Sequence, residues 1–204
     1  MRQGVLVLAA VGLAIGLASS AVLQSQAHSG DGISVELQAR AFQPGEVILL
    51  TVSLEEPVFR AEQPVSEVMV RAFGRRVQGY PAGERRWQAL VGIDIDQRAG
   101  TYPIVVELSG PSGTRRTTKP CQVWSKVFPT RTLRVDPDFV NPPAGVLARI
   151  QEEAALLRKV YEDTAASRLW RDPFVRPVEE PANSRFGSRS VYNGQRRSPH
   201  SGTD

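Results

Sequence analysis

The chain has 204 residues, of which 41% are hydrophobic and 23% charged, and this composition suits one globular domain with additional segments. Its formal net charge of +4 is a mild basic excess that fits an anionic surface such as a cell wall but specifies no fold. The single cysteine, Cys121, excludes an intramolecular disulfide and a cysteine-rich metal site, and its strand-like neighbours predict a buried, unreactive thiol.

The first 27 residues have the pattern of an export signal. Arg2 is followed by an apolar run, and the small residues Ser25 and Ala27 fit a signal-peptidase site directly after Ala27. The run is short for a transmembrane helix, which needs about 20 apolar residues, although a retained membrane anchor is the alternative. We therefore predict a signal peptide over 1–27 and a protein exported to the periplasm or cell envelope of a bacterium, in contact with the membrane only through this segment.

Residues 28–135 show the period-two alternation of half-buried β-strands, interrupted by frequent turns such as that at Pro44 and Gly45. About seven short strands with turns roughly every ten residues are typical of an immunoglobulin-like β-sandwich, so the fold is expected to be mainly β. Asp96, Gly100 and Tyr102 are spaced as in a tyrosine corner, where a tyrosine hydroxyl bonds to nearby backbone. The expected strands are 33–39, 47–54, 66–73, 77–80, 87–95, 101–108 and 117–127.

Nothing in this predicted sandwich indicates catalysis. Residues 33–135 contain no histidine, and the carboxylates lie near strand ends or turns, so we expect the domain to space, bind or orient. A nucleic-acid surface would need aromatic stacking platforms between its basic residues, and the export signal also argues against nucleic acid. The basic cluster is therefore expected to be a charged, solvated sheet edge; it comprises Arg71, Arg75, Arg76, Arg85 and Arg86.

Residues 136–170 are predicted to form a linker followed by an amphipathic α-helix. Asn141 can cap this helix, and Pro142 suits its first turn, where a missing N–H leaves no hydrogen bond unmade. Apolar residues then recur every three or four positions, which predicts a helix over about 142–166 with one apolar stripe. We expect the stripe to pack within the molecule, with a partner helix as the alternative; it comprises Val146, Ile150, Ala154, Leu157, Val160 and Tyr161.

Residues 171–204 are expected to begin a second, β-rich domain, with 183–187 as its first strand and turn. Near the end of this segment His200 and Asp204 lie four positions apart. Imidazole and carboxylate are common zinc ligands, and in an extended segment residues i and i+4 point to the same face. On spacing alone, the alternative is an ordinary polar loop.

A longer set of residues carries a family resemblance. Phe186-Gly187-x-Arg189, Asn193-Gly194 and Pro199-His200-Ser201-Gly202-x-Asp204 resemble the opening of a lysostaphin-type (M23) zinc metallopeptidase domain. In that family the His-x-x-x-Asp element supplies two zinc ligands, and a distant His-x-His element supplies the third ligand and a catalytic histidine. The resemblance implies that His200 and Asp204 are zinc ligands and that peptidoglycan is the partner.

The sequence departs from the family pattern because its only other histidine is His28. The third ligand and the catalytic histidines are therefore missing, and no catalytic residue is expected within this chain. We expect an N-terminal fragment of an exported zinc endopeptidase that cleaves peptidoglycan cross-links, inactive as this fragment. The alternatives are a non-catalytic envelope protein of the same family that activates other wall hydrolases, and a free-standing exported sandwich with a helical tail.

Overall fold

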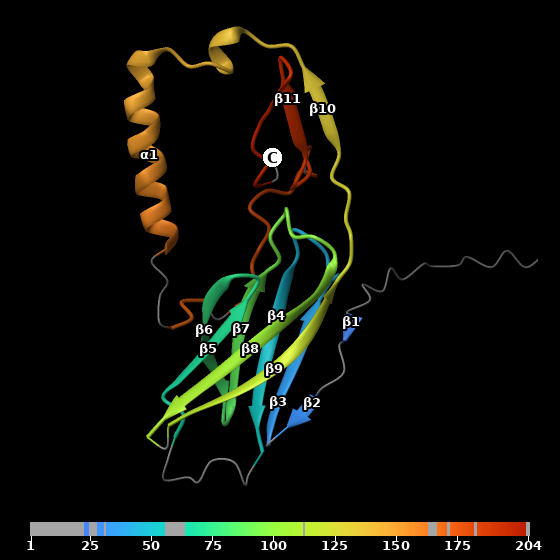
Figure 1. Cartoon of the computed structure of the whole chain (residues 1–204), viewed down its shortest axis with the longest axis vertical. Coiled ribbons are helices and arrows are strands. Elements are labelled where there is room, and N and C mark those ends of the chain that lie inside the picture. The colour runs from blue at the N-terminus through green and yellow to red at the C-terminus, as the bar shows by residue number, and fades with distance from the viewer. Residues whose placement is uncertain are drawn as a thin grey trace, which may run out of the picture.

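The computed structural model describes residues 23–24, 28–30, 32–55, 64–111, 113–162, 167–170, 172–181 and 183–202. The fold is mainly β, as predicted, and Figure 1 shows a β-sandwich, a small sheet beyond one end of it, and the long helix α1. Apart from residues 23 and 24, the predicted signal peptide lies outside the described residues. None of the helices within these ranges is long and apolar enough to cross a membrane.

Seven strands form the body of the sandwich, and each corresponds to one of the predicted strands. Neighbouring strands pair antiparallel, and the short strands β1 (Leu23–Gln24) and β2 (His28–Gly30) add to the edge of β3. The seven strands are β3 (Ile33–Ala39), β4 (Val47–Leu54), β5 (Glu67–Ala72), β6 (Arg75–Gly83), β7 (Arg86–Gly92), β8 (Gly100–Gly110) and β9 (Gly113–Val123).

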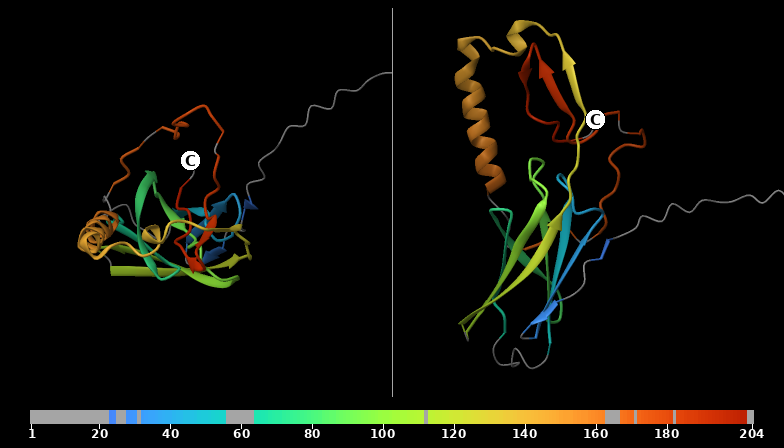
Figure 2. Two further views of the ribbon diagram at one scale, coloured as in Figure 1. Left: turned by 90° about the horizontal axis from the view of Figure 1, so that it is seen from above. Right: turned by 45° about the vertical axis from the view of Figure 1, so that its right-hand side comes forward.

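Strand β6 connects the two layers of the sandwich. Its residues 75–79 pair with β5, and residues 80–83 pair with β7 after a register shift between Pro81 and Gly83. One layer therefore contains β3, β4, β7 and the second half of β6, and the other contains β5, β8, β9 and the first half of β6. This is the strand arrangement of an immunoglobulin-like sandwich, and Figure 2 shows the two layers from above.

The core lies between these layers and is built from alternate residues of each strand. Leu37, Leu50 and Ile104 come from three different strands, and each is at most 1% exposed. Cys121 is also buried, and burial raises the pKa of its thiol to about 11, as expected for an unreactive cysteine. The predicted tyrosine corner is confirmed, because the Tyr102 hydroxyl donates a hydrogen bond of 2.9 Å to the backbone oxygen of Arg98.

The second half of the chain forms a short 3-10 turn, η1 (Pro137–Phe139), and then helix α1 (Ala144–Glu162). The helix begins two residues after the predicted start, and its predicted end at about 166 lies outside the described residues. The predicted packing of its apolar stripe is not observed, since Ile150 is 44% exposed and Leu157 54% exposed. Figures 1 and 2 show the helix beside the sandwich and the small sheet rather than packed on either of them.

A second, three-stranded sheet contains β10 (Thr130–Leu133), β11 (Arg189–Tyr192) and β12 (Gln195–Arg196). Strand β10 lies within the segment expected to close the sandwich, yet it pairs parallel with β11, almost 60 residues further along the chain. The strand expected at 183–187 is a turn region instead, and the strand itself begins at Arg189. The small sheet is therefore assembled from the two ends of the segment that contains α1.

Candidate functional site

The hairpin of β11 and β12 is fixed to the linker by Asn193. Asn193 and Gly194 form its turn with φ angles of 49° and 83°, a left-handed conformation that asparagine and glycine tolerate. The side chain of Asn193 donates to the backbone oxygen of Val135 at 2.8 Å and accepts from the Val135 N–H at 3.0 Å. The Asn-Gly element of the sequence block thus ties the hairpin to the chain that follows β10.

The Phe186–Gly187 element docks the small sheet on the end of the sandwich. Gly187 has a φ of 84°, and a Cβ there would lie 2.3 Å from two ring carbons of Phe128, so only glycine fits. The Phe186 ring packs in the same way over Gly45, in the turn between β3 and β4. This docking places β11 directly beyond the sandwich.

Arg189 supplies a second connection to the sandwich, as its guanidinium forms an ion pair with Asp96 near the tyrosine corner. Its backbone N–H donates to Pro129 at 2.8 Å, which continues the pairing with β10. Phe186, Gly187 and Arg189 therefore all have structural roles in holding the segment that precedes His200.

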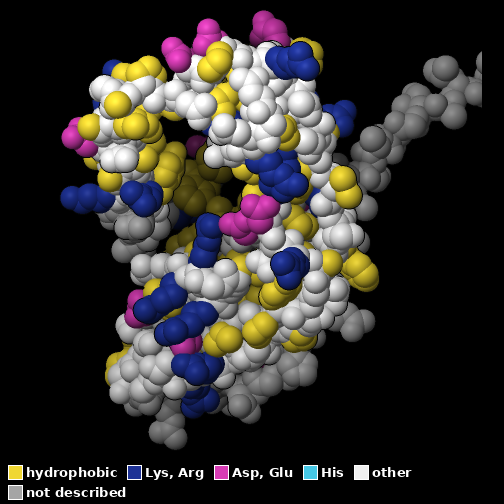
Figure 3. Space-filling view, turned by 45° about the horizontal axis from the view of Figure 1, so that its top comes forward, with side chains coloured by type: hydrophobic (Ala, Val, Ile, Leu, Met, Phe, Trp, Pro, Cys, Tyr) yellow, Lys and Arg dark blue, Asp and Glu magenta, His cyan; other side chains and the backbone are white. Residues whose placement is uncertain are grey.

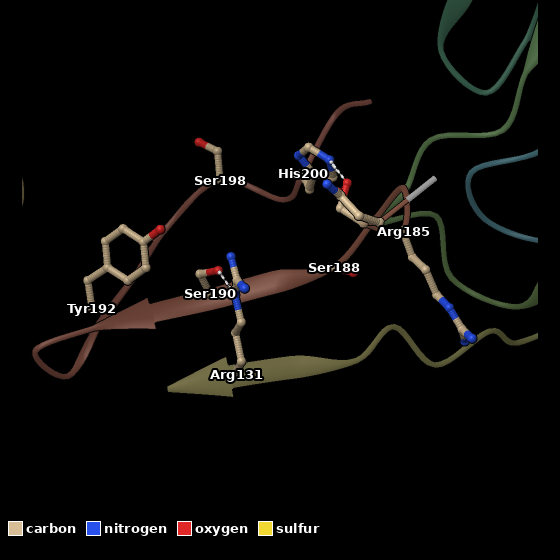
Figure 4. A pocket seen from close by; sticks show the side chains of 9 residues that line it. Arg131, Arg185, Ser188, Ser190, Tyr192, Ser198 and His200 are labelled. Atoms are coloured by element: carbon tan, nitrogen blue, oxygen red, sulfur yellow. Dashed lines mark hydrogen bonds between the residues drawn. The ribbon is translucent and has the colours of Figure 1, made fainter. Parts of the chain in front are cut away.

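Two backbone hydrogen bonds join His200 to the turn at Gly187 and Ser188. The Gly187 N–H donates to the His200 oxygen at 2.8 Å, and the His200 N–H donates to the Ser188 oxygen at 2.9 Å. Its Nε2 lies 2.8 Å from the Ser184 hydroxyl, so a metal ion at Nε2 would have to replace this hydrogen bond. The imidazole is half-buried and has a defined position (Figure 4).

A cavity of about 360 Å³ opens beside His200. Figure 4 shows Arg131 rising from β10 toward β11, while Arg185 points away from the imidazole. The Arg131 Nε donates to the Ser190 hydroxyl at 3.4 Å. Hydroxyl, amide and guanidinium groups make the cavity polar, and among the described residues no carboxylate lines it, so it favours anions. The lining residues are Arg131, Asn183, Ser184, Arg185, Ser188, Ser190, Tyr192, Ser198 and His200.

The predicted zinc site is only partly described. His200 lies in the cavity, but Asp204 lies outside the described residues, so the predicted pair remains a prediction. Among the residues that are described, no group of three or more His, Cys, Asp or Glu side chains could hold a metal ion. Structural zinc sites use four protein ligands and catalytic sites three, so the described donor set does not by itself fit zinc.

Sequence reasoning did not identify Ser184 or Arg131 as neighbours of His200. Ser184 lies in a bend, and Arg131 lies after the last predicted strand of the sandwich segment 28–135; neither position carries a recognisable motif. The only signal for Arg131 was the extended, β-compatible composition of residues 130–133.

Comparisons with known proteins give limited likeness. No protein-family model and no curated protein matches the chain. One similar solved structure is a protein of Pseudomonas aeruginosa provisionally classed as an M23 peptidase. The match covers 72% of this chain and 51% of the Pseudomonas chain, with 20% sequence identity and a TM-score of 0.46. Another is a DUF4785 family protein from Legionella pneumophila. That match covers 46% of this chain and 29% of the Legionella chain, with 10% sequence identity and a TM-score of 0.32.

The chain thus spans about half the length of the Pseudomonas protein and less than a third of the Legionella protein. At these levels of identity and overlap, neither likeness assigns a function to this chain.

Proposed function

We propose that this chain is the N-terminal part of an exported zinc metalloendopeptidase that hydrolyses peptide cross-links of peptidoglycan. The proposal rests first on the sequence block from Phe186 to Asp204, which resembles the opening of an M23 peptidase domain. In this proposal His200 and Asp204 are two of the zinc ligands.

The observation that carries the proposal is the fixed position of His200. Two backbone hydrogen bonds join it to Gly187 and Ser188, and Gly187 itself is packed on Phe128. A metal ligand must be held in one place by the surrounding structure, and the backbone N–H and C=O of this histidine are both hydrogen-bonded.

In this proposal the third ligand is a histidine of the family's His-x-His element, and the only other histidine of this sequence is His28. A zinc ion held there would polarise the scissile carbonyl and lower the pKa of a bound water to about 7. The chain's own residues have a different part: Gly187 and Ser188 hold the backbone of His200, Ser184 contacts its imidazole, and Arg131 gives the cavity positive charge. Guanidinium groups suit the free carboxylates of wall peptides.

A second candidate function is a non-catalytic envelope protein of the same family that binds or activates other wall hydrolases. One observation favours it: the Nε2 of His200 lies 2.8 Å from the Ser184 hydroxyl, an arrangement that needs no metal ion. Both proposed functions require export of the protein. Export is predicted from the signal-like pattern of residues 1–27.

The test is hydrolysis of isolated peptidoglycan by the native protein purified from its own cells. We expect release of soluble peptides that a chelator stops and zinc restores, loss of activity in His200→Ala, and retained activity in His28→Ala. Absence of cleavage together with stimulation of a separate wall hydrolase would establish the second function instead. Absence of both effects would exclude both functions.

A further inference from the structure

A second concave surface lies on the sandwich and shares no residue with the cavity at His200. It is a groove of about 500 Å³ beside the turn between β5 and β6, on the outer face of the layer that contains β5 and β8. Figure 3 shows Lys and Arg side chains gathered on this side of the sandwich. The groove lining includes Arg71, Phe73, Arg75, Arg76, Tyr102 and Pro103.

Two arginines face each other in this groove. Arg71 of β5 and Arg76 of β6 are directly opposite in the strand register, and both are exposed. Like charges at directly opposite positions destabilise a sheet. Arg76 has no ion-pair partner among the residues that the structure describes. An anion bound between the two guanidinium groups would remove this repulsion.

The buried carboxylate of Glu107 positions Arg71, but it shares its one negative charge between Arg71 and Arg116. It accepts a hydrogen bond of 3.2 Å from the Nε of Arg71 and one of 2.6 Å from Arg116. Burial alone would raise the pKa of Glu107, but the hydrogen bond from Arg116 and the charge of Arg71 outweigh it, and the pKa lies below its usual value. Arg71 contacts Glu107 through Nε, so its two terminal amino groups remain as further hydrogen-bond donors of an exposed side chain.

An aromatic pair forms the apolar wall of the groove. Phe73 and Tyr102 pack edge to face with ring centroids 5.5 Å apart, and the Tyr102 hydroxyl is fixed on Arg98. Phe73 has a φ of 50°, in the left-handed region where asparagine or glycine is usual at a hairpin turn. The ring is held in this strained turn by packing against the hydrophobic core, so it forms a fixed wall of the groove. Pro103 extends the same wall with an exposed apolar ring.

We propose that this groove binds a carboxylate-bearing saccharide. The forks of Arg71 and Arg76 would hold the carboxylate, and the rings of Phe73, Tyr102 and Pro103 would pack against the apolar face of the sugar. A nucleic acid would need a basic track with successive stacking platforms, whereas this surface is one compact groove with its two aromatic rings packed together. The proposal does not depend on the peptidase function, because every residue involved belongs to the sandwich.

The test is calorimetric titration of the protein, in about 0.15 M salt, with four probes: trigalacturonate, neutral chitotriose, tripolyphosphate and a short DNA duplex. We expect trigalacturonate to bind at least about tenfold more tightly than each of the other three, because it alone has both carboxylates and sugar faces. Equal binding of chitotriose, or tighter binding of tripolyphosphate or DNA, would overturn the proposal, as would no binding of trigalacturonate.

Variants separate binding from folding. Arg76→Glu is expected to weaken trigalacturonate binding at least about tenfold while the fold is retained, because an acidic side chain opposite Arg71 turns a like-charge pair into an ion pair. Arg86→Glu, at an exposed arginine on β7 in the other layer, is the matched control and should leave binding unchanged. Phe73→Asn keeps a residue that tolerates the turn, and should weaken trigalacturonate but not tripolyphosphate binding. Equal affinities of the wild type and Arg76→Glu would contradict the proposal.

Discussion

The β-sandwich and helix α1 place their apolar side chains in opposite environments. In the sandwich, Leu50 and Val70 lie in the core without exposed surface. On α1, Leu157 is 54% exposed and Val160 is 58% exposed. Both segments have a regular apolar period, but only the strands meet a complementary surface within the described residues.

The difference shows where the folding free energy of this chain is concentrated. A sandwich strand obtains hydrogen bonds and side-chain packing from its neighbours in the same domain, whereas α1 satisfies only its own backbone. Most helical stability in proteins comes from packing of an apolar face rather than from propensity. The sandwich is therefore expected to unfold as one cooperative unit whose stability depends little on α1.

The largest expected effect comes from a matched pair of leucine substitutions. Leu50→Ala should lower the free energy of unfolding by about 2–5 kcal/mol, because it leaves a cavity in a closed core. Leu157→Ala should change it by less than about 0.5 kcal/mol, because that side chain is already in solvent. Urea unfolding of both variants measures the difference, and equal losses would show that α1 is packed after all.

The docking of the small sheet can be broken separately from the sandwich. Gly187→Ala places a Cβ 2.3 Å from the Phe128 ring at a φ of 84°, so the turn must move, at a cost of about 1–3 kcal/mol. Hydrogen exchange should accelerate in β10 and β11 and stay unchanged in β4. Gly202→Ala, with no atom within 4 Å of its new Cβ, is the control. Faster exchange in β4 as well would mean that the two sheets form one cooperative unit.

An ion cluster at the exit of the sandwich gives a smaller, pH-dependent effect. The carboxylate of Glu46 accepts hydrogen bonds of 2.8 Å from Arg40 and 2.9 Å from Lys126, which leads into the linker. Burial alone would raise its pKa, but these two bonds outweigh burial and the pKa lies below the usual 4.5. A lowered carboxyl pKa stabilises the fold above the unfolded value, and this contribution is lost as the pH falls through the folded value.

Glu46→Gln should therefore lower the unfolding free energy by about 1–2 kcal/mol at neutral pH. The difference in unfolding free energy between this variant and the wild type should shrink as the pH falls below 4.5. Urea unfolding at neutral and at strongly acidic pH measures it. A deficit that is the same at both pH values would show that the ionised carboxylate contributes nothing.

The smallest expected effect concerns Ser184, whose hydroxyl lies 2.8 Å from the Nε2 of His200. If Nε2 is the ligating nitrogen, Ser184→Ala removes a competing hydrogen bond worth about 1 kcal/mol, and zinc affinity should rise about threefold to tenfold. Chelator competition on the native protein measures this change. Ser198→Ala, in the same cavity, is the control, and an unchanged or lower affinity in Ser184→Ala would exclude competition at Nε2.

The sandwich could be predicted from the sequence because each strand shows its own alternation of apolar and polar residues. Ile33, Val35 and Leu37 alternate with polar residues, and a strand with one buried face has no other stable register. The tyrosine corner and the buried Cys121 follow from the same strand pattern. The boundaries differ most at β9, which begins and ends four residues earlier than expected, because the polar residues at its start carry no alternating apolar pattern.

The small sheet could not be predicted, because it depends on partners distant in sequence. Strand β10 has Leu133 as its one apolar residue, and its parallel partner Arg189–Tyr192 follows a helix and a long extended segment. Likewise, the Arg189–Asp96 ion pair and the packing of Phe186 on Gly45 join residues with no local relationship. The sequence block predicts His200 as a site residue, but it does not predict the serine and arginine beside it.

The most direct test of the proposed zinc site is the zinc content of the native protein from its own cells, measured by elemental analysis together with its intact mass. The account predicts one zinc per chain, lost in His200→Ala and retained in His28→Ala. Native protein without zinc, or with zinc content unchanged by His200→Ala, would contradict the assignment of His200 as a ligand and leave the regulatory function as the better proposal.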